Sequence, residues 1–278
     1  MFSQFLLPHR FNFYRLFVVD VLHEIEIGIF KQIFTHLVWI LYTRGASVVA
    51  RLDRQYLLNP FSIVSVITFD VAISFRKVSS FGRSTIRNFS NNISEMKKFT
   101  ARDFEDVLQC AEPCFEGLFL KSVDSKIQDL LFVMACWHAS AKLWLHTEKT
   151  LHVFHGMTAT FTKEIQHFAN KICPQFDMIE TPSEFATNLH AEATRIKKGT
   201  CSTTQGAKWK TKSFNIDTSK FHSITHYPDT IAMYDTTDSY STQMVCHSIA
   251  TGYFSANMDT ILGRTRTSAC EEVLRKDQ

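Results

Sequence analysis

Apolar residues near the start of the chain recur at intervals of three and four, the spacing that places side chains on one face of an α-helix. This pattern follows directly after a β-favouring apolar run from Leu16 to Val19, and Asp20 separates the two. A carboxylate in that position can accept hydrogen bonds from the free amides of the first turn, so Asp20 is the predicted helix N-cap. The buried face of the predicted helix is formed by Leu22, Ile25, Ile29, Ile33, Leu37 and Ile40.

Similar periodic segments follow and predict a mainly α-helical protein with a few strands. We expect helices over 48–57, 100–113, 125–145, 147–172, 181–198 and 214–234. Gly45 is expected to end the first helix and Pro182 to begin a later one, whereas Pro228 is expected to kink or stop its helix. The run from Phe61 to Phe69 is rich in β-branched residues without a helical period, so it is predicted to be a strand.

The composition agrees with a folded, helix-rich protein. The 278 residues are 45% hydrophobic and 21% charged, and they include only 9 glycines and 6 prolines. Such a chain can bury a sizeable core, and it has few of the turn formers that many-stranded sandwiches need. The formal net charge of +3 is too small to indicate nucleic-acid binding by itself.

Cysteine usage and the apolar segments predict an intracellular protein that does not cross a membrane. The 7 cysteines form no paired framework, as expected for reduced thiols inside the cell. Residues 1–11 lack the features of a signal peptide. Polar residues interrupt 27–42, and Pro60 and Asp70 interrupt 57–75, so neither segment has the roughly 20 apolar residues that a membrane span needs.

The first helical turn carries a candidate metal site. Asp20, His23 and Glu24 lie at i, i+3 and i+4, so their side chains emerge on one face. Such a set at the end of a strand could hold a divalent metal, with Asp20 and Glu24 as the carboxylate ligands. The same spacing is also typical of a helix cap followed by two solvated acids, and spacing alone does not separate the two interpretations.

Basic residues alternate with aromatic ones in two places, a pattern that can contact phosphates and stack on bases. The first lies within 76–102 and includes Arg83, Arg87, Lys97 and Lys98. The second is Lys208, Trp209 and Lys210, in a basic linker predicted to be flexible over 199–213. The first series is also typical of the wet side of an amphipathic helix, and Trp209 could instead anchor the linker on the domain.

Histidines in the central part of the chain raise the question of a second metal site. They are His138, His146, His152, His155 and His167. Only His152 and His155 are near neighbours on one helix, and no acid lies at the same spacing. We therefore expect these histidines to bind no metal.

Several motif runs together resemble a known family. The runs are D-V-L-H-E-x-E-x-G over 20–28, F-G-R-x-T-I-R-N-F-S-N-N over 81–92, S-E-M-K-K over 94–98, A-R-D-F-E-D-V-L-Q-C over 101–110, W-H-A-x-A-K-L-x-L-H-T over 137–147 and T-T-D-S-Y-S-T-Q over 236–243. They are similar to proteins encoded by mobile elements of mushroom-type (basidiomycete) fungi, the Plavaka and related KDZ or CACTA-like transposases. The resemblance covers most of residues 9–56 and 76–243.

The resemblance implies a ribonuclease H-like (DDE-type) catalytic domain with a large helical insertion. Such enzymes cleave and join DNA with two divalent cations about 3.5–4 Å apart, normally held by three carboxylates. Mg²⁺ or Mn²⁺ suits that site because both ions accept oxygen ligands. By position, Asp20 corresponds to one of the three acids, with His23 beside it. The implied partner is DNA, which would place a functional protein in the nucleus.

The sequence departs from the family pattern at three places. We expect the acid of the first catalytic strand to lie upstream of the printed residues. In the family, a Gly-Glu-Leu segment and a His-Arg-rich helix follow and supply the last acid. They do not follow Gln243 here, and we interpret 244–278 as a divergent tail from a frameshift or wrong splice. Residues 57–75 are an extra apolar insertion between segments that are nearly adjacent in the family, and we interpret them as a translated intron.

These observations divide the chain and predict a function. The predicted parts are a strand–helix segment (1–56), the insertion (57–75), a helical domain (76–198), the linker (199–213), a return segment (214–243) and the tail (244–278). With one of three expected carboxylates, we predict a transposase remnant without strand cleavage or transfer and without tight Mg²⁺ binding. The alternative is a non-enzymatic helical module that binds nucleic acid or a protein. The sequence contains no indication of the oligomeric state.

If residues 57–75 are a translated intron, spliced messenger RNA should join codon 56 to codon 76 and lack the codons between them. Sequencing of transcripts across this region tests the interpretation. Transcripts that keep the codons for both 57–75 and 244–278 in one frame would contradict it.

Overall fold

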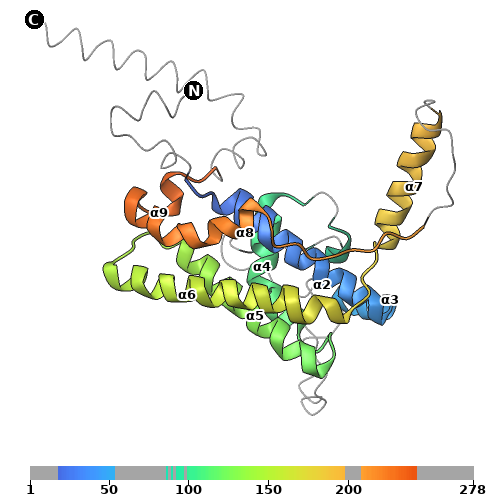
Figure 1. Ribbon diagram of the computed structural model, residues 1–278, viewed down its shortest axis with the longest axis horizontal. Helices are drawn as coiled ribbons and strands as arrows, with labels where there is room; N and C mark the ends of the chain where they lie inside the picture. Colours follow the sequence, from blue (N-terminus) through green and yellow to red (C-terminus); the bar gives the residue numbers. More distant parts are fainter. Residues whose placement is uncertain are drawn as a thin grey trace, which may run out of the picture.

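The computed structural model of the chain describes residues 18–53, 86, 89, 92–96, 99–197 and 208–242. These residues are mainly helical, as predicted (Figure 1). An isolated antiparallel β-bridge pairs Ile179 with Thr211. The strand expected to end at Asp20 is not formed by its described residues, from Val18 onward. The predicted strand 61–69, the insertion 57–75 and the tail 244–278 lie outside the described residues.

The central element is a long helix made of two continuous parts. A π-helix, η3 (Val21–Phe30), leads directly into α2 (Lys31–Arg44). Asp20 caps it as predicted, since its Oδ1 accepts a hydrogen bond from the Leu22 amide at 3.2 Å. Gly45 ends it with a φ of +113°, a value that glycine adopts without steric strain. The predicted apolar stripe from Leu22 to Ile40 is buried along its whole length.

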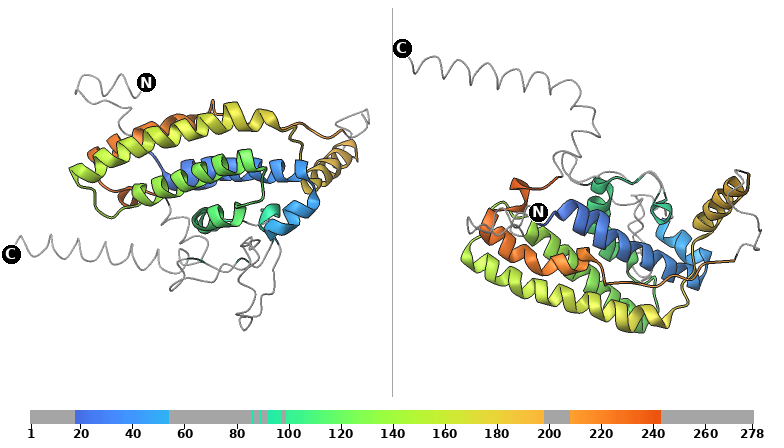
Figure 2. Two further views of the ribbon diagram at one scale, coloured as in Figure 1. Left: turned by 90° about the horizontal axis from the view of Figure 1, so that it is seen from below. Right: turned by 45° about the horizontal axis from the view of Figure 1, so that its top comes forward.

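The other helices are packed in layers around this central helix. They are α3 (Ala46–Asp53), α4 (Ala101–Phe115), α5 (Lys121–Ala141), α6 (Glu148–His167), α7 (Pro182–Lys197), α8 (Ser219–Ser223) and α9 (Tyr227–Tyr234). The middle layer contains η3, α2 and α5, and α6 lies with α8 and α9 on one side of it (Figure 2). α4 and α3 lie on the opposite side, and α7 projects from one end (Figure 1).

Short helical turns connect several of these helices. They are η5 (Ile93–Glu95), η6 (Phe168–Ile172), η7 (Cys173–Gln175), η8 (Ile224–His226) and η9 (Thr237–Ser239). Two helix starts carry a recognisable sequence signal. Thr100 and Thr147 each form a capping box at the N-terminus of their helix. The helix expected to kink or stop at Pro228 is interrupted just before it, by η8, and Pro228 lies in the first turn of α9.

Aromatic side chains fill the space between the layers. Trp137 of α5 is fully buried, and its ring lies 5.3 Å from the rings of Phe154 and Phe161 on α6 and 4.9 Å from that of Tyr227 on α9. Its indole Nε1 donates to Thr158 Oγ1 at 2.9 Å, so the one polar atom of the ring has a partner. This cluster joins the consecutive helices α5 and α6 to α9, which lies far from them in the sequence.

The central helix also meets the length and composition criteria for a membrane span. Val21–Arg44 has 24 residues, and its 18-residue apolar window has a mean hydropathy of 1.2 and is 72% buried inside the fold. A core helix of a folded protein meets the same criteria. Its burial by the surrounding helices favours that interpretation here.

Gly28 provides a test of the close packing around η3. A Cβ atom there would lie 2.7 Å from the His23 carbonyl oxygen and 2.8 Å from Lys220 Cδ. We expect Gly28→Ala to lower the free energy of unfolding by about 1–3 kcal/mol, because backbone atoms must move to relieve the overlap. Urea denaturation monitored by circular dichroism measures the change.

The matched control is Gly156→Ala, in the middle of α6, where an added Cβ would meet no atom within 4 Å. There the substitution should raise the free energy of unfolding by about 0.5–1 kcal/mol, because alanine loses less conformational entropy than glycine in a helix. Stabilisation by both substitutions would contradict the packing at Gly28.

Candidate functional site

Asp20, His23 and Thr242 form a hydrogen-bonded cluster at the N-terminal end of η3. The Thr242 hydroxyl donates to Asp20 Oδ2 at 2.5 Å, and His23 Nδ1 lies 2.5 Å from the same oxygen. Thr242 Oγ1 and His23 Nδ1 are 2.9 Å apart. The Asp20 side chain is 18% exposed and that of His23 is 51% exposed. Because Asp20 and Thr242 are 222 residues apart in the sequence, the return segment closes on the start of the central helix.

Residues four apart on η3 share the face that contacts the return segment. One turn after Asp20, Glu24 Oε2 accepts a hydrogen bond from the buried Tyr227 hydroxyl at 3.0 Å. One turn further, the Lys220 side chain lies against Gly28. Burial raises the pKa of Tyr227 well above its ordinary value, and the charges of Glu24 and Asp20 raise it further. The phenol is therefore a hydrogen-bond donor at neutral pH.

The metal ligands predicted from the sequence, Asp20 and Glu24, are both hydrogen-bonded within the protein. Ligand atoms of Asp20, His23 and Glu24 do not meet as a group of three in the described part of the chain. Metal binding by Asp20 and Glu24 therefore stays a prediction. The alternative interpretation is a helix cap followed by solvated acids. Its cap is confirmed, but the acids are not solvated as expected, because Glu24 is half-buried and Glu26 is fully buried.

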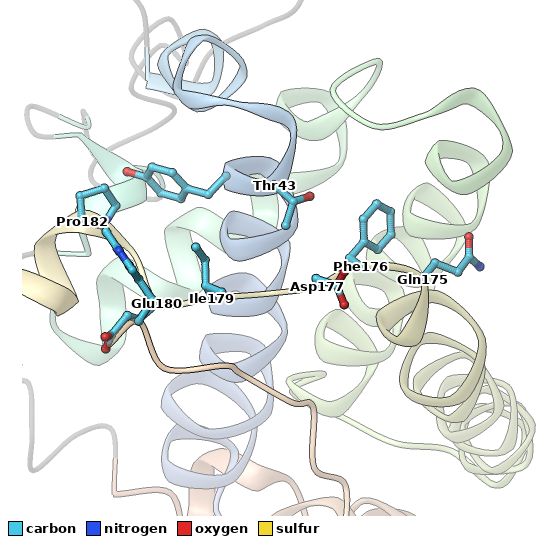
Figure 3. Close-up of a pocket in the computed structure, with 9 residues that line it drawn as sticks. Thr43, Gln175, Phe176, Asp177, Ile179, Glu180 and Pro182 are labelled. Atoms are coloured by element: carbon cyan, nitrogen blue, oxygen red, sulfur yellow. The ribbon is translucent and has the colours of Figure 1, made fainter. Parts of the chain in front are cut away.

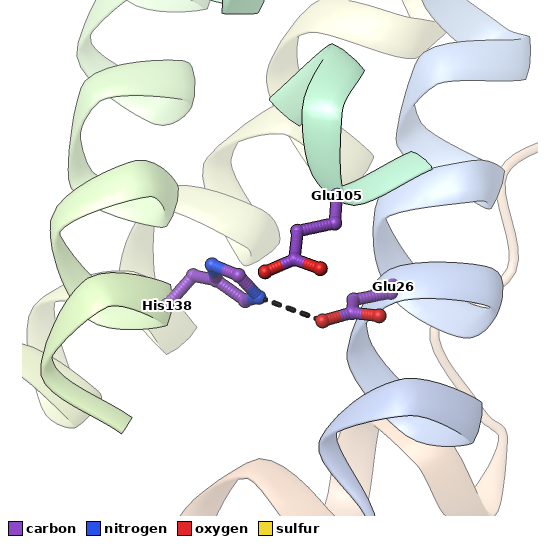
Figure 4. Close-up of side chains that lie close together, drawn as sticks. All are labelled: Glu26, Glu105 and His138. Atoms are coloured by element: carbon purple, nitrogen blue, oxygen red, sulfur yellow. Dashed lines mark hydrogen bonds and ion pairs between the residues drawn. The ribbon is translucent and has the colours of Figure 1, made fainter. Parts of the chain in front are cut away.

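A second polar cluster, which the sequence analysis missed, lies in the centre of the fold. Glu26 of η3, Glu105 of α4 and His138 of α5 point toward one another (Figure 4). His138 Nε2 lies 3.0 Å from Glu26 Oε1. Lys142, next to the end of α5, donates to Glu105 Oε1 at 2.6 Å and lies 3.4 Å from Glu26 Oε1. We call Glu26, Glu105, His138 and Lys142 the buried charge cluster.

Electrostatic interactions within this cluster stabilise the ionised forms of Lys142 and Glu105. Burial acts to lower the pKa of Lys142, but the charges and hydrogen bonds of Glu26 and Glu105 outweigh it and raise this pKa. Burial acts to raise the pKa of Glu105, but the ammonium group of Lys142 outweighs it and lowers this pKa. Both groups are thus charged at neutral pH.

One sequence signal could have identified this cluster. Glu26 follows Leu22 by four residues and Ile25 by one, so it falls within the apolar stripe of the first helix. A carboxylate at a core position needs a partner, and the partner His138 is 112 residues away in the sequence. Helical spacing from the histidines does not reveal a pair that only tertiary packing brings together.

The basic and aromatic residues predicted to bind nucleic acid fall into two groups. Arg83, Arg87, Lys97 and Lys98 lie outside the described residues. In the other group, Lys208 and Lys210 are exposed, and Trp209 stacks on Phe185 of α7 with ring centroids 4.2 Å apart and an interplanar angle of 12°. This contact agrees with the alternative in which Trp209 anchors its segment on the domain.

Backbone pairing holds the same segment in place. The Glu180 amide donates to the Lys210 carbonyl at 3.0 Å, and the Lys212 amide donates to the Met178 carbonyl at 2.9 Å. Residues 208–212 of the predicted flexible linker are therefore attached to the fold. Trp209 also lines a shallow open pocket of about 500 Å³ between α2, α7 and the chain that joins η7 to α7 (Figure 3). Its other lining residues include Tyr42, Phe176 and Glu180.

Comparison of the chain with family models, with curated proteins and with solved structures gave no match. The geometry itself therefore carries the functional argument, together with the motif resemblance.

The pair formed by Lys142 and Glu105 gives a pH-dependent prediction. Lys142→Met should lower the free energy of unfolding at pH 7 by about 3–5 kcal/mol, because it leaves two carboxylates without their cation. Since the folded pKa of Glu105 is lowered, this stabilisation is present above the ordinary carboxyl pKa of about 4.3 and is lost as the pH falls through the folded value. The difference between wild type and Lys142→Met should therefore shrink in acid.

Urea denaturation of both proteins at pH 7 and at several values below pH 4 measures this difference. The matched control is Lys126→Met, because Lys126 and Asp129 form an exposed pair at 3.0 Å, which should contribute little to stability at any pH. A stability difference for Lys142→Met that is the same at every pH would contradict the prediction.

Proposed function

We propose that this chain is a transposase-derived helical protein that does not cleave or transfer DNA strands. The observation that carries the proposal is the meeting of motif runs that are distant in the sequence. Thr242, in the run 236–243, donates to Asp20, in the run 20–28. In the same way, Thr237 donates from its hydroxyl to the Ala141 carbonyl, in the run 137–147, at 2.8 Å.

The buried charge cluster adds to this support. Glu26, Glu105, His138 and Lys142 all belong to motif runs that carry the resemblance. Residues that carry the resemblance to transposases thus contact one another through specific polar interactions. In this proposal, the layered helices correspond to the helical insertion of a ribonuclease H-like domain, and Asp20 lies where that insertion joins the catalytic part.

The lack of strand cleavage in this proposal follows from the state of Asp20. A two-metal site needs carboxylate oxygens that are free to bind cations. Oδ1 of Asp20 accepts from the Leu22 amide, and Oδ2 is shared by the Thr242 hydroxyl and His23. A metal ion would have to displace these partners, and no group of three ligand atoms among the described residues includes Asp20. DNA remains the implied partner, and Mg²⁺ or Mn²⁺ the implied cofactor of intact relatives.

A nicking assay tests the proposal. Supercoiled plasmid DNA and the genomic DNA that flanks the coding sequence are incubated with the purified chain in Mg²⁺ or Mn²⁺. We expect wild type and Asp20→Asn to give the same background level of nicked product, with or without metal. Asparagine is as good an N-cap as aspartate, so the variant should keep the helix start.

The control for nonspecific effects of removing an acid is Asp217→Asn, at an exposed position outside the cluster. Metal-dependent nicking by wild type and by Asp217→Asn that disappears in Asp20→Asn would show an active metal site at Asp20 and refute the proposal.

A further inference from the structure

Three potential metal ligands meet in the centre of the fold, away from the Asp20 cluster. Glu26, Glu105 and His138 come from three different helices, and their ligand atoms all lie within 4.8 Å of one another (Figure 4). Glu26 and His138 are almost completely buried. We propose that these three residues form a site for a divalent transition-metal ion, and that Zn²⁺ fits its chemistry. The proposed function does not require this site.

Glu26 has unused capacity to bind a cation. Its side chain is fully buried, and its Oε1 makes the contacts with His138 and Lys142. Its Oε2 has no hydrogen-bond partner. A buried carboxylate oxygen without a partner is costly, because it has lost its hydration without a replacement. A metal ion bound through this carboxylate would supply the missing interaction.

A dication would interact with both glutamates of the cluster, and Glu26 would gain most from it. The Lys142 ammonium group lies 2.6 Å from Glu105 and 3.4 Å from Glu26, and the charge of Arg102 also acts on Glu105, so Glu26 is the less closely paired of the two carboxylates. His138 adds a second positive charge only when both of its ring nitrogens carry protons. A Zn²⁺ ion balances both carboxylates while a neutral His138 binds it through a ring nitrogen.

The ligand types favour a transition-metal ion such as Zn²⁺ over Mg²⁺ and Ca²⁺. An imidazole with two carboxylates is a ligand set that Zn²⁺ accepts, whereas Mg²⁺ and Ca²⁺ prefer oxygen ligands alone. Zinc binds nitrogen and oxygen at about 2.0–2.2 Å, which places tetrahedral ligands roughly 3.3 Å apart. His138 Nε2 and Glu26 Oε1 are 3.0 Å apart, close to that spacing, and the Glu105 ligand atom lies within 4.8 Å of both. Water can supply a fourth ligand.

Lys142 competes with a metal for this position. Its ammonium group lies against both glutamates, and its side chain is 20% exposed. Lys142 follows Ala141, the last residue of α5, where a lysine side chain can turn toward solvent. Metal binding would displace the ammonium group, so removal of this charge should strengthen metal binding.

Isothermal titration calorimetry of the full chain with Zn²⁺, together with thermal melting, tests the proposal. Glu26→Gln should bind Zn²⁺ at least about tenfold more weakly, because even the loss of an outer-shell partner costs roughly 10- to 100-fold in metal affinity. Lys142→Met should bind Zn²⁺ at least about tenfold more tightly, because a nearby like charge is removed. Zn²⁺ should also raise the melting temperature of Lys142→Met more than that of wild type. Mg²⁺ should produce neither effect.

Exposed histidines also bind zinc, so His152→Gln is the matched control, and it should leave the affinity unchanged. Glu105→Gln removes a less buried ligand and should show the same loss as Glu26→Gln, which keeps the test valid if the latter variant does not fold. Equal zinc affinity in wild type, Glu105→Gln and Lys142→Met would overturn the proposal. So would the absence of zinc binding by Lys142→Met.

Discussion

The fold depends on the burial of the helix that runs from Val21 to Arg44. Fully burying one large aliphatic side chain contributes roughly 1.5–3 kcal/mol, and this helix buries the whole apolar stripe from Leu22 to Ile40. The polar side chains at the start of this helix contact two different parts of the fold. Asp20 and Glu24 contact the return segment, while Glu26 contacts α5. The helix therefore holds both polar clusters in fixed positions within one apolar environment.

The π-helical geometry of η3 is part of this constraint. Gly28 lies close enough to the His23 carbonyl that a Cβ atom would overlap with it, and the Lys220 side chain occupies the same space. Short π-helical segments are uncommon and are found frequently at functional sites. In this protein the segment coincides with the motif run 20–28, so the unusual backbone and the residues that carry the resemblance occupy the same turns.

Local signals in the sequence were enough to predict most of the helical fold. The stripe from Leu22 to Ile40 and the cap at Asp20 depend only on neighbouring residues, and the structure contains both. Pro228 lies beside the expected interruption, but the sequence did not place it in the first turn of α9, because the φ restriction that stops one helix also suits the start of another.

The candidate site was only partly predictable for a physical reason. Asp20, His23 and Glu24 could be placed on one face because they share a turn, but their partners Thr242 and Tyr227 come from the far end of the chain. The link between Glu26 and His138 likewise depends on tertiary packing, which helical spacing does not encode. Trp209 left two alternatives open, since a stacked indole has the same sequence context whether its partner is a base or Phe185.

Stability alone does not explain the buried charge cluster. Replacing a buried ion pair by apolar residues of similar size is often neutral or stabilising by about 1–4 kcal/mol, so Glu26 within an apolar stripe needs another reason. One reason is specificity, because only one register of α5 against η3 brings His138 and Lys142 to Glu26. A metal ion is a second reason, and the two are compatible. The contacts that fix this register also bring the ligand atoms of Glu26, Glu105 and His138 within reach of one cation.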